Sequence, residues 1–239
     1  CHRVPATLFT DVVSAFDCQY LLGLSATAFR KDDGLTRLIY FYMGDRIHKV
    51  DQDELKATGA ILKPRLIRRE TDFHCHYRGD YPVLIKKITH HEARNRQIVA
   101  DVAARVREPG AGTALVVSDR VAHCELLFDI LKKQDVRVEM LTGQLAPDTR
   151  AEIVARVHQG EVEVLLATLQ LISEGFDCPG LDSLFLTTPI AFEGRILQVI
   201  GRIMRPAADK QPLVYDYVDV QVPSLKKSAN IRQRILSDL

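Results

Sequence analysis

The stretch "TALVVSDRVAHCELLFDILKKQDVRVEML", residues 113–141, decides the fold class of this chain. It contains an apolar run, an amphipathic segment and a second apolar run, a pattern that predicts a strand, a helix and a strand. The alternation continues through "APDTRAEIVARVHQG" (146–160), "VEVLLAT" (162–168) and "LDSLFLTTP" (181–189). Continuously apolar strands between amphipathic helices indicate a parallel sheet with helices on both faces. We therefore predict an α/β fold.

Composition limits the function classes. The chain has 239 residues, of which 46% are hydrophobic and 26% charged, and its formal net charge is +1. This composition is typical of a globular protein, and the charge neither favours nor excludes nucleic acid. No apolar run is long enough to span a membrane, and the opening residues lack a signal-peptide pattern. Five cysteines without Cys-x-x-Cys spacing favour a reducing compartment, so we expect a cytoplasmic protein.

A metal site and a helix cap are the two interpretations of the histidine-rich stretches. In "HCH" (74–76), strand alternation directs Cys75 away from both histidines, which argues against zinc. His90 and His91 lie at the beginning of the segment 89–108, which is predicted to be an amphipathic helix, and a capping or surface role is expected for them.

The polar residues that follow the predicted strands are the first candidate site. In a parallel sheet, functional residues gather at the carboxyl ends of the strands. Three such ends are Ser118, Thr142 with Gly143, and Thr168. Each could also be a simple turn or cap residue.

A second candidate site lies in "QVIGRIMRP", residues 198–206. Helical periodicity places Gln198, Arg202 and Arg205 on one face, and Pro206 is expected to end the helix. The other face carries a core-facing stripe of Ile196, Val199, Ile200 and Ile203. Guanidinium groups suit phosphate oxygens, although salt bridges to an acidic face would use the same side chains.

Taken together, five motifs resemble those of the superfamily 2 helicases, the DExH/DEAD-box ATPases. "LGLSAT" (22–27) is similar to motif III, "ALVVSD" (114–119) to motif IV, "ATLQLISEGFD" (167–177) to motif V and "QVIGRIMRP" to motif VI. The opening "CH" resembles the end of motif II. "SEGFDCPGLD" resembles the RadD/XPB-like or restriction-motor branch, whose members act mainly on DNA.

The resemblance implies two RecA-like lobes that clamp ATP between them. It implies that residues 1–55 are the C-terminal remnant of the first, ATP-binding lobe, that 56–225 form the second lobe, and that 226–239 form a C-terminal helix. Within this first part we predict a strand in "QYLLGLSAT" (19–27), a helix from residue 34 and a polar linker at 51–59. ATP and Mg²⁺ would be held mainly by the missing first lobe.

The resemblance also assigns expected roles to individual residues. The catalytic arginine fingers and the residue that supports them are Arg202, Arg205 and Gln198. The nucleotide-linked positions of motif V are Gly175 and Asp177. The residues that couple the lobes are Ser25, Thr27 and His2. The contacts to a single-stranded nucleic-acid track are Ser118, Arg120, Thr142, Gly143 and Thr168.

Two absences bear on activity. No glycine is followed by lysine, so the phosphate loop G-x-x-x-x-G-K-[ST] does not occur. The only adjacent Asp-Glu pair, Asp53-Glu54, lies in the polar stretch rather than after an apolar strand. We therefore expect negligible ATP hydrolysis by this chain alone.

The substrate and the class remain open between several hypotheses. Apolar Val199 and Ile200 replace polar residues common in the motif VI of RNA helicases, which favours DNA. The alternatives are an ATP-dependent RNA helicase and a non-catalytic nucleic-acid-binding RecA-like module. An unrelated doubly wound small-molecule enzyme would require all five motif matches to be coincidental.

Overall fold

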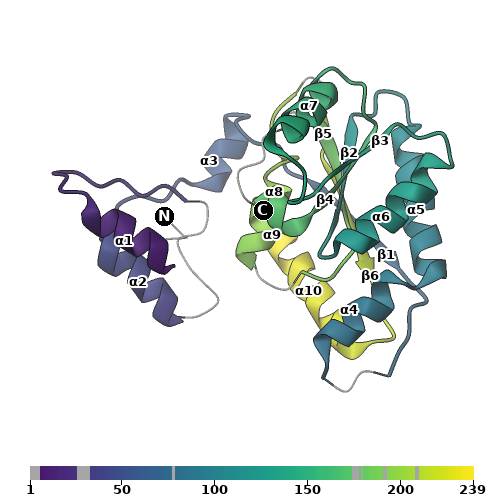
Figure 1. Cartoon of the computed structure of the whole chain (residues 1–239), viewed down its shortest axis with the longest axis horizontal. Helices are drawn as coiled ribbons and strands as arrows, with labels where there is room; N and C mark the ends of the chain where they lie inside the picture. The colour runs from purple at the N-terminus through teal and green to yellow at the C-terminus, as the bar shows by residue number, and fades with distance from the viewer. Residues whose placement is uncertain are drawn as a thin grey trace.

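The computed structural model describes residues 6–25, 33–76, 79–173, 178, 180–190, 193–207 and 210–239. Figure 1 shows a helical N-terminal segment joined through α3 (Gln52–Ala57) to a layered body that contains the whole sheet. Across the described ranges, no helix is both long enough and apolar enough to cross a membrane.

Six parallel strands form the sheet of the described chain, and they follow the order β1-β6-β5-β2-β4-β3. This arrangement confirms the predicted parallel sheet. The strands are β1 (Arg65–Glu70), β2 (Thr113–Ser118), β3 (Val138–Leu141), β4 (Val164–Thr168), β5 (Leu181–Leu186) and β6 (Leu213–Val218).

Helices cover both faces of this sheet (Figure 1). One face packs against α5 (Glu92–Val106) and α6 (Val121–Lys132). The opposite face packs against α7 (Pro147–His158), α8 (Leu169–Ser173), α9 (Glu193–Ile200) and α10 (Pro223–Ser237).

Strand β2 shows why the strands are apolar throughout. Its residues Leu115 and Val117 face the core under α7 to α10, whereas Ala114 and Val116 face the core under α5 and α6. All six residues of β2 are buried. A strand covered on both faces shows no polar alternation, which is the pattern seen in the sequence.

Helix α4 (Tyr81–Thr89) was not anticipated in the sequence. The Asp80 carboxylate caps it by accepting a hydrogen bond from the Val83 backbone N–H at 3.3 Å. Leu84 and Ile88, one turn apart, pack with residues at the start of α10 and after β1, in a small cluster completed by Phe73, Val222 and Leu225.

The N-terminal segment consists of α1 (Thr7–Ala15), α2 (Asp33–Met43) and α3. The prediction of a strand at 19–27 is wrong over residues 19–25, which carry no strand. A strand needs the main-chain groups of a neighbouring strand, and all six strands of the described sheet lie elsewhere. The predicted polar linker contains α3. The proposed division at residues 55 and 225 stays a prediction.

Candidate functional site

The strand register brings three of the candidate residues together at one edge of the sheet. Ser118 pairs with Thr168 at the ends of β2 and β4. Leu141 pairs with Ala167, so Thr142 follows β3 beside Thr168. The carboxyl ends of β2, β4 and β3 therefore form a continuous edge, as predicted from the parallel order.

Accessibility separates these residues into two kinds. Arg120 and Gly143 are exposed, and Thr168 is half-buried. Ser118 and Thr142 are buried, with exposed fractions of 1% and 3%. The groups that can meet a ligand at this edge are therefore Arg120, Gly143 and part of Thr168, while Ser118 lies behind them.

The Ser118 hydroxyl is used inside the protein. Its oxygen lies 3.0 Å from Nδ1 of His123 and accepts a hydrogen bond from the Arg120 backbone N–H at 3.2 Å. Burial, together with the smaller effects of the nearby Arg94 and His90, lowers the pKa of His123 to about 3, so this imidazole is neutral near pH 7.

Asp119 directly follows β2 and contacts the residues that follow β5. Its backbone N–H donates to the Thr188 hydroxyl at 2.9 Å, and its carboxylate lies 3.8 Å from the Arg195 guanidinium. Burial raises the pKa of Asp119, whereas Arg195 and Arg120 act to lower it. Arg195 thus connects α9 to the loop after β2.

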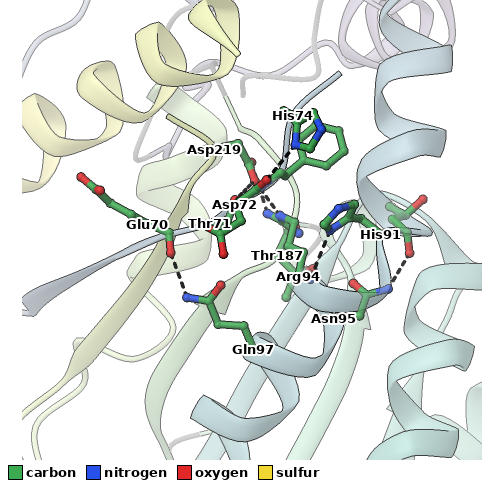
Figure 2. Close-up of polar contacts among 12 residues, drawn as sticks. Glu70, Thr71, Asp72, His74, His91, Arg94, Asn95, Gln97, Thr187 and Asp219 are labelled. Atoms are coloured by element: carbon green, nitrogen blue, oxygen red, sulfur yellow. Dashed lines mark hydrogen bonds and ion pairs between the residues drawn. The ribbon is translucent and has the colours of Figure 1, made fainter. Parts of the chain in front are cut away.

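A buried ionic network adjoins this edge at the ends of β1, β5 and β6 (Figure 2). The Arg94 guanidinium donates from Nε to Oδ1 of Asp219 at 2.8 Å and from Nη1 to the Thr187 carbonyl at 2.7 Å. The Thr71 hydroxyl donates to Asp219 at 2.6 Å. The sequence reasoning missed this network, since Arg94 lies in a polar stretch and only the acid after the apolar strand β6 could have suggested it.

His91 caps the helix that carries Arg94, as one of the two interpretations predicted. Its Nδ1 accepts a hydrogen bond from the Arg94 backbone N–H at 3.2 Å, at the beginning of α5 (Figure 2). The described residues hold no group of three or more His, Cys, Asp and Glu side chains that could bind a metal ion.

The arginines of "QVIGRIMRP" do not lie within a helix, which corrects the sequence prediction. Helix α9 ends at Ile200. The backbone N–H groups of Arg202 and Ile203 donate to Val199 and Ile200, three residues earlier, at 3.2 and 3.0 Å. These bonds tighten the chain into a turn. Ile203 nevertheless stays fully buried, so the predicted core stripe is confirmed.

These arginines lie at the opposite edge of the sheet from Ser118. Helix α9 starts near Asp119, at the carboxyl edge, and leads to β6, which starts at the amino edge. There the Met204 carbonyl accepts a hydrogen bond from Leu62 N–H at 2.8 Å, just before β1. Arg202 and Arg205 are half-buried at this end, and Gln198, within α9, is half-buried as well. The candidate residues therefore form two separate groups.

The segment that follows Thr168 joins these two groups. It begins as α8 at the carboxyl edge, where α8 packs against α9, and β5 begins at the amino edge. Gly175 and Asp177 belong to this segment but lie outside the described residues, as do Thr27 and His2. Ser25 is exposed and is the last described residue before residues 26–32, which include Thr27.

The chemistry of the second group suits a polyphosphate rather than a metal ion. Guanidinium groups offer only N–H donors, which match phosphate oxygens and cannot ligate Mg²⁺. Arg202 and Arg205 therefore offer donors for phosphate oxygens and no ligand for a metal ion.

Comparisons with known proteins decide the family. Residues 96–207 match the family described as "Helicase conserved C-terminal domain". The chain carries a superfamily 2 helicase C-terminal lobe. The chain that carries this lobe is 24% identical over 243 residues to the "ATP-dependent DNA helicase uvsW" of Enterobacteria phage T4, covering 98% of this chain and 47% of that protein.

Other relatives of the helicase lobe differ in the nucleic acid that their names give. The lobe is 24% identical to the "Putative ATP-dependent RNA helicase L396" of Acanthamoeba polyphaga mimivirus, covering 97% of this chain and 44% of that protein. The chain thus spans less than half the length of these relatives.

Solved structures share the fold of the helicase lobe. The crystal structure of T4 UvsW has a TM-score of 0.55 at 20% identity and covers 72% of this chain and 38% of its own. The structure of S. cerevisiae Dbp5 bound to RNA and ADP BeF3 has a TM-score of 0.63 at 14% identity, covering 90% and 48%. These likenesses confirm the predicted RecA-like fold.

Proposed function

We propose that this chain is the second motor lobe of an ATP-dependent DNA helicase or translocase. In this proposal Arg202 and Arg205 reach the γ-phosphate of an ATP held by a first lobe, and Gln198 supports them. A guanidinium beside that phosphate stabilises the charge that spreads over its oxygens in the transition state. Arg120, Gly143 and Thr168 contact the backbone of a single strand at the other edge.

The observation that carries the proposal is the separation of the two groups by the length of the sheet. A motor must bind nucleotide and track at different places and connect them. Here α8, which follows Thr168 at the track edge, packs on α9, and α9 leads to Arg202. Gly175 and Asp177, in the segment after Thr168, are proposed to link the two events, and Ser25, Thr27 and His2 to couple this lobe to the first.

The proposal is tested by ATP hydrolysis with and without single-stranded DNA. Two proteins are compared: this chain, and a longer protein that adds a first lobe upstream. We expect negligible turnover by the chain and DNA-stimulated turnover by the longer protein. Arg202→Ala in the longer protein should lower kcat by about 10³-fold or more, as expected for an arginine finger.

The matched control is Arg96→Ala, since Arg96 is an exposed arginine that pairs with Glu92, one turn away on α5. The Arg96→Ala variant should leave kcat unchanged. Turnover by the chain alone that depends on Arg202 would refute the split-site proposal. A longer protein without turnover would favour the non-catalytic nucleic-acid-binding module.

RNA is the second candidate substrate, because one relative is named as an RNA helicase. The same assay with single-stranded RNA separates the two. Stimulation by RNA and not by DNA would replace DNA in the proposal and leave the roles of Arg202 and Arg205 intact.

A further inference from the structure

A chain of buried hydrogen bonds links the end of α4 to the loop after β2. The Thr89 carbonyl accepts a hydrogen bond from Nδ2 of Asn95 at 2.9 Å. Oδ1 of Asn95 lies 3.1 Å from Nε2 of His123, whose Nδ1 lies 3.0 Å from the Ser118 hydroxyl. The three side chains are each at most 2% exposed.

The directions of these bonds follow from the chemistry of the groups. Because Nδ2 of Asn95 donates to a carbonyl, Oδ1 is the acceptor that faces His123, so Nε2 carries the imidazole proton. Nδ1 then holds a lone pair and accepts the Ser118 O–H. The remaining lone pairs of Ser118 face the Arg120 backbone N–H, which donates to them at 3.2 Å.

The backbone carbonyl of Arg120 is held by the first turn of α6. Its carbonyl accepts hydrogen bonds from the backbone N–H groups of His123 and Cys124, both at 3.2 Å, at the beginning of α6. The backbone of Arg120 is thus fixed through its N–H and its C=O, while the side chain is exposed at the carboxyl edge. A long side chain loses less freedom on binding when its Cα is already fixed.

We propose that His123 and Asn95 are positioning residues that hold Arg120 toward the nucleic-acid backbone through the Ser118 hydroxyl. The inference rests on the proposed function, since it concerns the same edge. Ser118 is in this view a support and Arg120 the contact. A neutral imidazole is required, and the depressed pKa of His123 keeps it neutral near pH 7.

Two substitutions of His123 separate the two bonds that its ring makes. In His123→Asn the amide oxygen can occupy the place of Nδ1 and accept the Ser118 O–H, but the bond to Asn95 is lost. In His123→Gln the amide reaches the place of Nε2, so the bond to Asn95 is kept and the bond to Ser118 is lost. Ser118→Ala removes the anchor of the Arg120 N–H.

The readout is the salt dependence of binding to labelled oligo-dT and oligo-U, measured by fluorescence anisotropy on this 239-residue chain. For single strands, each phosphate contact contributes about 0.7 to the slope of log K against log salt. Arg120→Ala should lower the slope by about that amount. Ser118→Ala and His123→Gln should lower it equally, His123→Asn should retain it, and the double variant Ser118→Ala/Arg120→Ala should lower it no further.

The control is Lys133→Ala, since Lys133 is exposed at the other end of α6, and its slope should equal that of the wild type. Urea unfolding of every variant separates stability from positioning. If Ser118→Ala and His123→Gln lose stability but keep the wild-type slope while Arg120→Ala lowers it, the inference fails and the proposed function stands. If His123→Asn lowers the slope as much as His123→Gln does, the hydrogen bond between Ser118 and His123 does not position Arg120. A wild-type chain that binds neither strand overturns both.

Discussion

Arg94 and Asp219 form an ion pair that is almost completely removed from water. Nε of Arg94 lies 2.8 Å from Oδ1 of Asp219, and the two side chains are 1% and 2% exposed (Figure 2). The pair joins α5 to the residue that follows β6, and Arg94 also donates to the Thr187 carbonyl after β5. Two strand ends and one helix therefore depend on a single guanidinium.

Removing one partner of this pair should be far more costly than removing an exposed pair. Arg94→Ala leaves the Asp219 carboxylate buried without its counter-charge, so we expect a loss of about 3–5 kcal/mol in the free energy of unfolding. Arg96→Ala, which breaks an exposed pair with Glu92, should cost less than about 0.5 kcal/mol. Urea unfolding measures both, and equal losses would contradict the prediction.

His123 should make stability depend on pH. Its folded-state pKa of about 3 lies below the ordinary value of about 6.5, so between these values the unfolded chain binds one proton more. The stabilisation is complete above about pH 6.5 and is lost as pH falls, by about 1.4 kcal/mol for each unit.

His123→Gln cannot titrate and serves as the comparison for that pH effect. The difference in unfolding free energy between wild type and variant should narrow by about 2 kcal/mol from pH 7.5 to pH 5. Asp119 and Asp216, whose pKa values burial raises, titrate in both proteins and cancel. A constant difference over this range would show that His123 has the same pKa in the folded and unfolded states.

Ile88 should stabilise one local unit rather than the whole sheet. It is fully buried in the small cluster that joins α4 to α10, so Ile88→Ala should cost about 2–5 kcal/mol through lost contacts and a cavity. We expect faster amide exchange in α4 and at the beginning of α10, with β2 and β4 unchanged. Val83→Ala, on the exposed side of α4, is the control and should change neither.

Gly112 and Gly143 should respond differently to an added methyl group. A Cβ at Gly112 would lie 2.9 Å from the Gly180 carbonyl oxygen, so Gly112→Ala should cost about 1–3 kcal/mol. A Cβ at Gly143 meets no atom of the described residues within 4 Å, so Gly143→Ala should leave urea unfolding unchanged. Weaker oligo-dT binding by Gly143→Ala would then report close approach of a strand, whereas unchanged binding would remove Gly143 from the proposed track.

The sheet could be predicted because strands that are buried on both faces appear in the sequence as runs of mostly apolar residues. Every residue of β2, β5 and β6 is buried, and most residues of each strand are apolar. The edge formed by Ser118, Thr142 and Thr168 followed from parallel order alone.

The parts that could not be predicted depend on contacts distant in sequence or on small changes of helical geometry. Arg94 and Asp219 lie 125 positions apart, and nothing local distinguishes this arginine from the exposed Arg96. The end of α9 was missed because Ile203 faces the core either from a helix or from a tightened turn. The apolar segment at 19–25 has strand composition, but the described sheet offers it no neighbour.

Helix α5 carries a buried arginine ion pair near each of its ends. Arg94 holds Asp219 at the carboxyl edge, and Nη2 of Arg105 holds Oδ2 of Asp182, in β5, at 2.6 Å toward the amino edge. Sliding the helix by one turn, about 5.4 Å, would break both pairs at once. We therefore expect the lobe to move as one rigid body. A rotation that displaces Arg202 should then turn Arg120 through the same angle.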